Sequence, residues 1–156
     1  MSDDRLHITL QRLGQFEGRI PQALIDLALA AGGLLEHEPF DVCLNLLQSR
    51  GGQDANGKGT VELSGLGVNV QMLRSFQRAL GGAMRRAGFA EAQIRNRFTP
   101  HMTLDYGVGG VPRKAVEPFA WTVGQFALVD SLYGLSEHDV LAQWPLVARQ
   151  QSFSNW

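Results

Sequence analysis

Two short segments of the chain repeat the pattern His-x-Thr-Leu. The first contains His7 and Thr9, and the second contains His101 and Thr103. In a β-strand, residues i and i+2 point to the same face, so each histidine would lie beside its threonine. Two such strands placed side by side would project two imidazoles and two hydroxyls into one groove.

These side chains suit phosphoryl transfer between two oxygens. The reaction needs a base at the attacking oxygen and an acid at the leaving oxygen. Histidine serves as either, because its reference pKa is about 6.5. Threonine hydroxyls can donate hydrogen bonds to phosphate oxygens. A single His-x-Thr in a strand is more often structural, so the interpretation depends on the two copies. The pattern then predicts a phosphate-handling site that needs no metal and no cofactor.

Hydrophobic periodicity predicts the elements that position these residues. In chain order, we expect a strand over 5–13, a helix over 21–35, strands over 40–47 and 60–66, a helix over 69–87, and strands over 98–106, 120–132 and 140–147. Loops rich in glycine are expected over 48–59 and 107–118. Strands outnumber helices and do not alternate regularly with them. This favours an α+β fold with mainly antiparallel pairing.

The second expected helix has a clear apolar stripe. Leu73, Phe76, Leu80 and Met84 share one face at helical spacing. Asn69 precedes them, and its side chain could cap the helix. This stripe is the best sequence signal for a helix packed on the core.

Length and composition indicate one domain. The chain has 156 residues, of which 44% are hydrophobic. We expect a single domain over 1–148 and a tail over 149–156. The net charge of −1 excludes a global polybasic surface, so long-range capture of nucleic acid should be weak. The start of the chain is polar and no apolar run could span a bilayer, so we expect a cytoplasmic protein without a membrane partner.

The paired motifs resemble the signature of the two-histidine (2H) phosphoesterase superfamily. The segments 5–14 (RLHITLQRLG) and 97–104 (RFTPHMTL) are similar to the two motif strands of its LigT-like branch, the 2′-5′ RNA ligases or RNA 2′,3′-cyclic phosphodiesterases. Segment 140–146 (VLAQWPL) also resembles the closing hairpin of that branch. The resemblance implies two lobes related by a pseudo-twofold axis. Their mainly antiparallel sheets would surround a central groove that carries the motifs.

The resemblance also implies an activity. It is hydrolysis of a cyclic phosphodiester, a 2′,3′-cyclic phosphate of an RNA end or of a nucleotide, with 2′-5′ RNA ligation as the reverse reaction. The family tendency makes His101 the base and His7 the acid, although the two are formally interchangeable. An alternative interpretation is a nucleotide- or RNA-end-binding module with little catalytic activity.

Several other residues near the motifs are candidates for substrate binding. Arg12 and Arg97 flank the motifs and could contact phosphates, and Tyr106 could stack on a base. We expect Arg95 to be an exposed surface charge and Phe98 to pack in the core.

The remaining two histidines lie outside the motifs. His37 precedes an expected strand, and His138 falls at an expected hairpin turn. We expect both to be solvated, because neither belongs to a regular set of metal ligands.

The chain departs from the family pattern at its start. Relatives have a strand and a helix ahead of the first motif, whereas six residues precede His7. We therefore expect the fold without this first strand and helix, which would leave unpaired backbone groups at a sheet edge. Cover would come from a second copy, as a homodimer, or from the tail through Phe153 and Trp156.

Overall fold

The computed structural model describes residues 6–51, 59–106, 110–132 and 137–148. The elements are, in chain order, α1 (Gln22–Leu34), β1 (Phe40–Gly51), β2 (Gly59–Ser64), the 3-10 helix η2 (Gly67–Val70), α2 (Gln71–Ala87), the 3-10 helix η3 (Glu91–Gln93), β3 (His101–Tyr106), β4 (Lys114–Val123), β5 (Gln125–Leu132) and β6 (Glu137–Pro145). Each pair of neighbouring strands is antiparallel. The expected α+β class is therefore confirmed.

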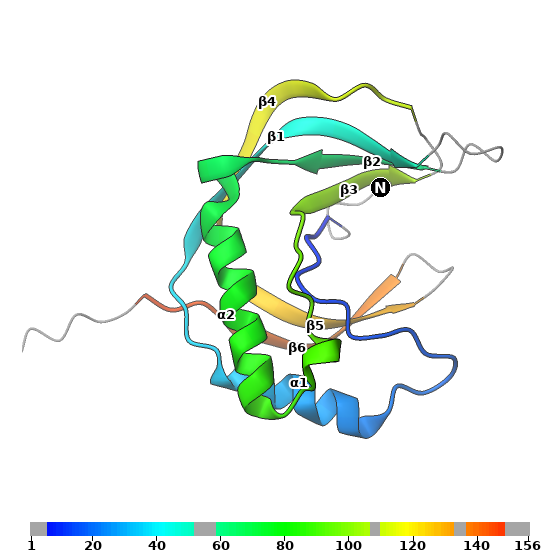
Figure 1. Cartoon of the computed structure of the whole chain (residues 1–156), viewed down its shortest axis with the longest axis vertical. Coiled ribbons are helices and arrows are strands. Elements are labelled where there is room, and N and C mark those ends of the chain that lie inside the picture. The colour runs from blue at the N-terminus through cyan, green and yellow to red at the C-terminus, as the bar shows by residue number, and fades with distance from the viewer. Residues whose placement is uncertain (1–5, 52–58, 107–109, 133–136, 149–156) are drawn as a thin grey trace, which may run out of the picture.

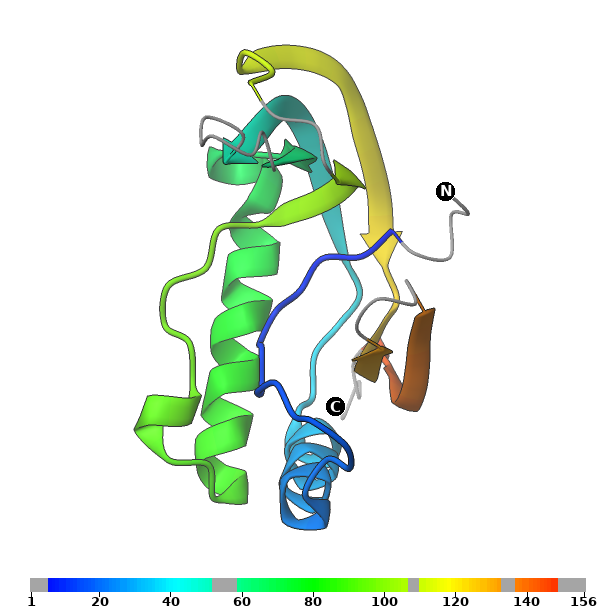
Figure 2. The ribbon, with the colours of Figure 1, turned by 90° about the vertical axis from the view of Figure 1, so that its right-hand side faces the viewer.

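The strands form two separate sheets. The larger has the order β3-β2-β1-β4, and the smaller consists of β5 and β6. Figure 1 shows the larger sheet at one end of the molecule and α1 at the other, with α2 running between them. Figure 2 shows β4 curving from the larger sheet toward the smaller one. The two sheets correspond to the two lobes of the expected fold.

Helix α2 joins two apolar clusters. Leu73 and Phe76 are buried in the first, and Met84 is buried in the second with Leu80 packed against it. The predicted stripe is therefore confirmed. The buried members of the first cluster are Phe40, Val42, Leu44, Val70, Leu73, Phe76, Met102 and Leu146. Those of the second are Ala28, Ala31, Met84, Phe89 and Ile94.

Strand β1 is longer than its apolar run predicts. The expected strand ended at residue 47, but β1 continues to Gly51 because residues 46–51 pair with β2. The expected loop over 48–59 therefore contributes ladder residues at both ends. The segment is polar because Gln48 and Arg50 in it hydrogen-bond to Glu62 of β2.

The expected strand over 120–132 is two strands in different sheets. Gly124 separates β4 from β5, and its carbonyl accepts a hydrogen bond from the Leu146 amide at 2.8 Å. Strand β4 also begins inside the predicted loop over 107–118, and it contains Pro118. Pro118 falls at a register shift of the ladder, between the pairs Leu44–Phe119 and Leu46–Ala115, and β4 is an edge strand, which are the two places in a sheet where proline is tolerated.

Three further expectations concern the cap of α2, the tail and the membrane. Asn69 is not the cap of α2, because it lies inside η2 and Val70 takes the cap position without a side-chain hydrogen bond. The tail over 149–156, with Phe153 and Trp156, lies outside the described residues. In the part of the chain that the structure describes, no helix is long and apolar enough to cross a membrane.

Candidate active site

The two motifs meet at one antiparallel bridge. Ile8 pairs with Met102, on the side of β3 that β2 leaves open. Met102 is buried in the first apolar cluster and Ile8 packs against it. The expected strand over 5–13 is otherwise absent from the described residues, because beyond this bridge the segment forms no strand ladder. Ile8 and Met102, the residues between the histidine and threonine of each motif, therefore face the core.

The histidine and threonine of each motif lie on the opposite face. Exposure alternates along 6–10, so that His7 and Thr9 are exposed while their neighbours are partly buried. His101 and Thr103 are both partly exposed on β3. Continuing the bridge register by one residue each way would set His7 opposite Thr103 and Thr9 opposite His101. The two histidines then occupy diagonal positions on one surface.

Hydrogen bonds from glutamine side chains, rather than strand pairing, hold the segment that follows the first motif. Gln11 donates to the Arg95 carbonyl at 3.1 Å and accepts from the Arg95 amide at 2.9 Å. Gln77 of α2, which is buried, donates to the carbonyls of Leu10 at 3.3 Å and Arg95 at 2.9 Å. These bonds tie the segment after the first motif to the segment before the second.

The face that carries the second motif extends across the larger sheet. Thr103 lies opposite Glu62 of β2, and Glu62 lies opposite Gln48 of β1. In the next row, His101 lies opposite Ser64. Because opposed residues of antiparallel strands share a face, polar side chains from three strands surround the second motif.

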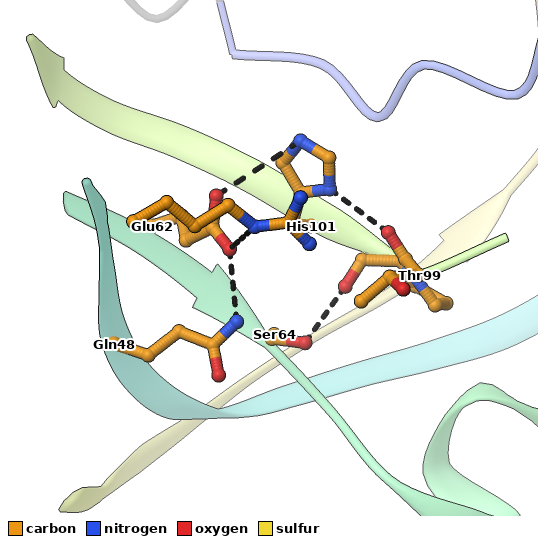
Figure 3. A network of polar contacts seen from close by, with 7 residues as sticks. Gln48, Glu62, Ser64, Thr99 and His101 are labelled. Carbon is orange, nitrogen blue, oxygen red and sulfur yellow. Dashed lines mark hydrogen bonds and ion pairs between the residues drawn. The ribbon is translucent and has the colours of Figure 1, made fainter. Parts of the chain in front are cut away.

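Glu62 is a buried carboxylate at the centre of this face. Its side chain is 1% exposed. One oxygen, Oε1, accepts from Gln48 Nε2 at 2.8 Å and from Arg50 Nε at 2.7 Å. The other, Oε2, lies 3.9 Å from His101 Nε2 (Figure 3). A buried carboxylate is costly unless it is paired, and the half-exposed Arg50 supplies the pairing charge.

Sequence reasoning missed these three residues. Gln48 and Arg50 fell in the predicted loop, and Glu62 was one polar residue in a short strand. The available signal was alternation, because Gln48 and Arg50 continue the two-residue period of β1 beyond its apolar part.

The ring of His101 is held in one orientation. Its Nδ1 lies 2.8 Å from the Thr99 carbonyl, and a carbonyl can only accept. Nδ1 therefore carries the hydrogen, and in the neutral ring Nε2 keeps its lone pair. Ser64 Oγ donates to the Pro100 carbonyl at 2.7 Å, which fixes the turn into β3. The free lone pair of His101 thus faces the side on which Glu62 lies.

The histidine of the first motif contacts the smaller sheet. His7 and His138 lie edge to face, with ring centroids 4.7 Å apart. The expectation that His138 is a solvated turn residue is wrong, because it is partly buried in β6 opposite Ser131. The polar composition around His138 is typical of a turn, but Glu137, His138 and Asp139 pair with β5. The structure thus adds a third histidine beside the motifs.

His37 lies in the loop before β1, as expected, but its ring is partly buried rather than fully solvated. Its ring lies edge to face with Phe40 and Phe76, at 5.4 and 5.1 Å between centroids. Its Nδ1 is 2.7 Å from the Glu38 carbonyl. His37 therefore packs against two members of the first cluster.

The candidate substrate-binding residues all lie at the surface. Tyr106 is 66% exposed and shares a row of the sheet with Thr60 and Arg50. Arg12 is exposed and donates to Gln15 Oε1 at 3.2 Å, and Arg97 is exposed. Tyr106 is thus the candidate whose row continues the site face.

Phe98 and Arg95 occupy the positions expected of them. Phe98 packs against the first apolar cluster, and the side chain of Arg95 is exposed. Within the described ranges, no group of three or more His, Cys, Asp or Glu residues could hold a metal ion.

Solved structures share this fold. E. coli LigT complexed with 3′-AMP matches 94% of this chain and 80% of its own, with a TM-score of 0.67 and 23% identity. TT0787 of Thermus thermophilus matches with the same coverage, a TM-score of 0.66 and 22% identity. E. coli LigT complexed with phosphate matches 95% of this chain and 79% of its own, with a TM-score of 0.61 and 21% identity. These likenesses concern the fold.

Sequence comparison identifies the family. A search of curated proteins found no match. Residues 1–134, which include both motifs and most of the strands, match the family described as the 2′-5′ RNA ligase superfamily. The paired motifs, the two sheets and this match agree, and the chain belongs to the 2′-5′ RNA ligase superfamily of 2H phosphoesterases.

Proposed function

We propose that this protein hydrolyses the 2′,3′-cyclic phosphate of an RNA end or of a nucleotide, without a metal ion. The observation that supports this most is the bridge between Ile8 and Met102, which joins the two His-x-Thr motifs. An acid and a base on one surface are what the displacement of one phosphate oxygen by another requires.

In the proposed mechanism, His101 is the base and His7 is the acid. The free Nε2 of His101 takes a proton from water as the water oxygen bonds to phosphorus. The bond from phosphorus to one ribose oxygen breaks, and His7 gives that oxygen a proton. Thr9 and Thr103 donate hydrogen bonds to the non-bridging phosphate oxygens. The product is a phosphate monoester beside a free hydroxyl.

The structures of relatives are consistent with this substrate class. E. coli LigT forms crystalline complexes with 3′-AMP and with phosphate. A ribonucleoside 3′-phosphate is one of the two products that opening a 2′,3′-cyclic phosphate can yield. We therefore expect this protein to bind a nucleoside phosphate at the same surface.

Opening of the same cyclic phosphate by an alcohol would make a 2′-5′ linkage. A ribose 5′-hydroxyl would attack phosphorus in place of water, with the same two histidines. Water is present at a far higher concentration than a ribose 5′-hydroxyl, so hydrolysis is the reaction that we propose for the isolated enzyme.

Recognition should concentrate on the end of the RNA. At a net charge of −1, the protein lacks the overall positive charge for long-range attraction of a polynucleotide. We propose that Arg12 and Arg97 contact phosphates and that Tyr106 stacks on the adjacent base. We also propose that residues 1–148 form a single two-lobed phosphoesterase domain.

A turnover assay tests the proposal. The four nucleoside 2′,3′-cyclic phosphates and a short RNA with a cyclic phosphate end would be incubated with the protein, with and without EDTA. We expect monoester product in both conditions. Binding of a nucleoside phosphate without turnover would instead support the alternative, a nucleotide- or RNA-end-binding module with little catalytic activity. Activity that EDTA abolishes and a divalent ion restores would contradict the metal-free mechanism.

A further inference from the structure

The buried carboxylate of Glu62 has no role in the mechanism above, yet it lies beside the atom that performs the first proton transfer. Both hydrogen bonds from Gln48 and Arg50 go to its Oε1. Oε2 lies on the His101 side, 3.9 Å from Nε2. The inference that follows rests on the proposed function and concerns the choice of nucleophile.

The gap between Glu62 and His101 separates two hydrogen-bond acceptors. Nε2 of the neutral ring holds a lone pair because Nδ1 donates to Thr99. A carboxylate oxygen also only accepts. At 3.9 Å the two atoms are too far apart for a direct hydrogen bond even when Nε2 is protonated. A group that donates two hydrogen bonds from one atom would satisfy both.

Water is the nucleophile with this property. If a water oxygen lies about 2.8 Å from each acceptor, the angle Nε2–oxygen–Oε2 is roughly 90°, which allows two bent hydrogen bonds. A ribose hydroxyl has a single hydrogen, so it would satisfy Nε2 and leave Oε2 without a donor. A buried charged acceptor left without its hydrogen bond carries a substantial free-energy cost.

We propose that Glu62 is a further catalytic residue, which orients the attacking water and selects water over an alcohol. One water hydrogen points to His101 Nε2 and is transferred as the oxygen bonds to phosphorus. The other points to Glu62 Oε2 and stays on the new phosphate oxygen. The bond to the ribose oxygen breaks as that oxygen takes a proton from His7. Gln48 and Arg50 hold the carboxylate in place throughout.

Two substitutions separate orientation of water from a purely structural role. Glu62→Gln keeps an oxygen for Gln48 and Arg50 and turns a donor toward His101. Water and an alcohol can then each donate to His101 and accept from the amide, so the discrimination disappears. Glu62→Asp keeps the negative charge, but the side chain is shorter by one methylene and the carboxylate lies farther from His101. Arg50 is half exposed, so water can solvate it when the carboxylate is replaced. Glu117→Gln, at an exposed glutamate of β4, is the matched control.

The experiment measures how the substrate divides between two products, the methyl ester and the monoester. Each protein would react with a nucleoside 2′,3′-cyclic phosphate in buffer containing methanol, and 31P NMR would measure methyl ester against monoester. We expect the ratio of methyl ester to monoester to rise about 10- to 100-fold in Glu62→Gln and Glu62→Asp. Glu117→Gln should match the wild type. Circular dichroism would confirm folding.

Several results would overturn this inference. A ratio that stays within twofold of the wild type, in either folded variant, would show that Glu62 does not select the nucleophile. A 15N spectrum of the free wild-type protein with the hydrogen of His101 on Nε2 would remove the acceptor that the inference needs, whether or not the variants fold. If the wild type opens no cyclic phosphate, the proposed function fails and this inference fails with it. A wild type that hydrolyses while the ratio is unchanged rejects this inference alone.

Discussion

His7 and His138 lie edge to face with ring centroids 4.7 Å apart and an interplanar angle of 67°. This contact joins the first motif to the smaller sheet, whereas the bridge at Ile8 joins it to the larger one. The first histidine is therefore held between the two sheets, in a segment that is not a regular strand. The orientation of the His7 ring therefore depends on the contact with His138 and on the bridge at Ile8.

Replacing His138 should affect His7 through this ring contact. An edge-to-face pair contributes about 0.5–1.5 kcal/mol, so we expect His138→Ala to lower turnover about 2- to 10-fold. His138→Phe keeps a ring at this position and should retain most of the activity. Steady-state kinetics on a cyclic phosphate would compare the two. Equal losses in both variants would mean that His138 acts through its nitrogens rather than its ring.

The two motif histidines should be individually required. As an acid–base pair, His7→Ala and His101→Ala should each lower kcat by a factor on the order of 100 to 10,000. The double variant should lose little more, because residues that act as a unit are not additive. The wild-type pH–rate profile should be bell-shaped, since one ring must hold a proton and the other must lack it.

A histidine outside the site provides the control for that experiment. His37 packs against Phe40 and Phe76, so His37→Ala should lower stability and leave kcat of the folded protein near the wild-type value. Wild-type kcat in either motif variant, or a flat pH profile, would refute the acid–base assignment.

The amide contacts of Gln11 should contribute to stability. Gln11→Ala removes two hydrogen bonds to the backbone of Arg95, and we expect it to lower the free energy of unfolding by about 1–3 kcal/mol. Urea denaturation would measure the change. Gln143→Ala, at an exposed glutamine of β6, should stay within about 0.5 kcal/mol. Equal effects of the two substitutions would argue against this link between the motifs.

Adjacent glycines of α1 should respond in opposite ways to alanine. A Cβ at Gly32 would overlap the ring of Trp144, which stacks on Phe126, so Gly32→Ala should destabilise the protein by about 1–3 kcal/mol. A Cβ at Gly33 meets no atom within 4 Å, and Gly33→Ala should stabilise α1 by up to about 1 kcal/mol. Thermal unfolding of both variants would test this. A neutral Gly32→Ala would mean that α1 and β6 do not pack as described.

Local patterns were sufficient for much of the fold. Both helices, the apolar stripe of α2 and the alternation that turns His7 and Thr9 away from Ile8 follow from residues close together in the chain. The boundaries were less predictable where pairing decides them. Strand β1 continues through polar residues because β2 supplies its partners, and Gly124 divides one apparent strand between two sheets.

The sequence by itself determined the two His-x-Thr motifs and the shared face of each pair, because residue type and two-residue spacing are local properties. Only the tertiary structure decided what surrounds them. Glu62 meets both Arg50 and His101 through the pairing of three strands, and His138 reaches His7 from the smaller sheet. Such contacts join residues far apart in the chain. They are set by strand register and by the path of the chain between sheets, which no local pattern of residue types contains.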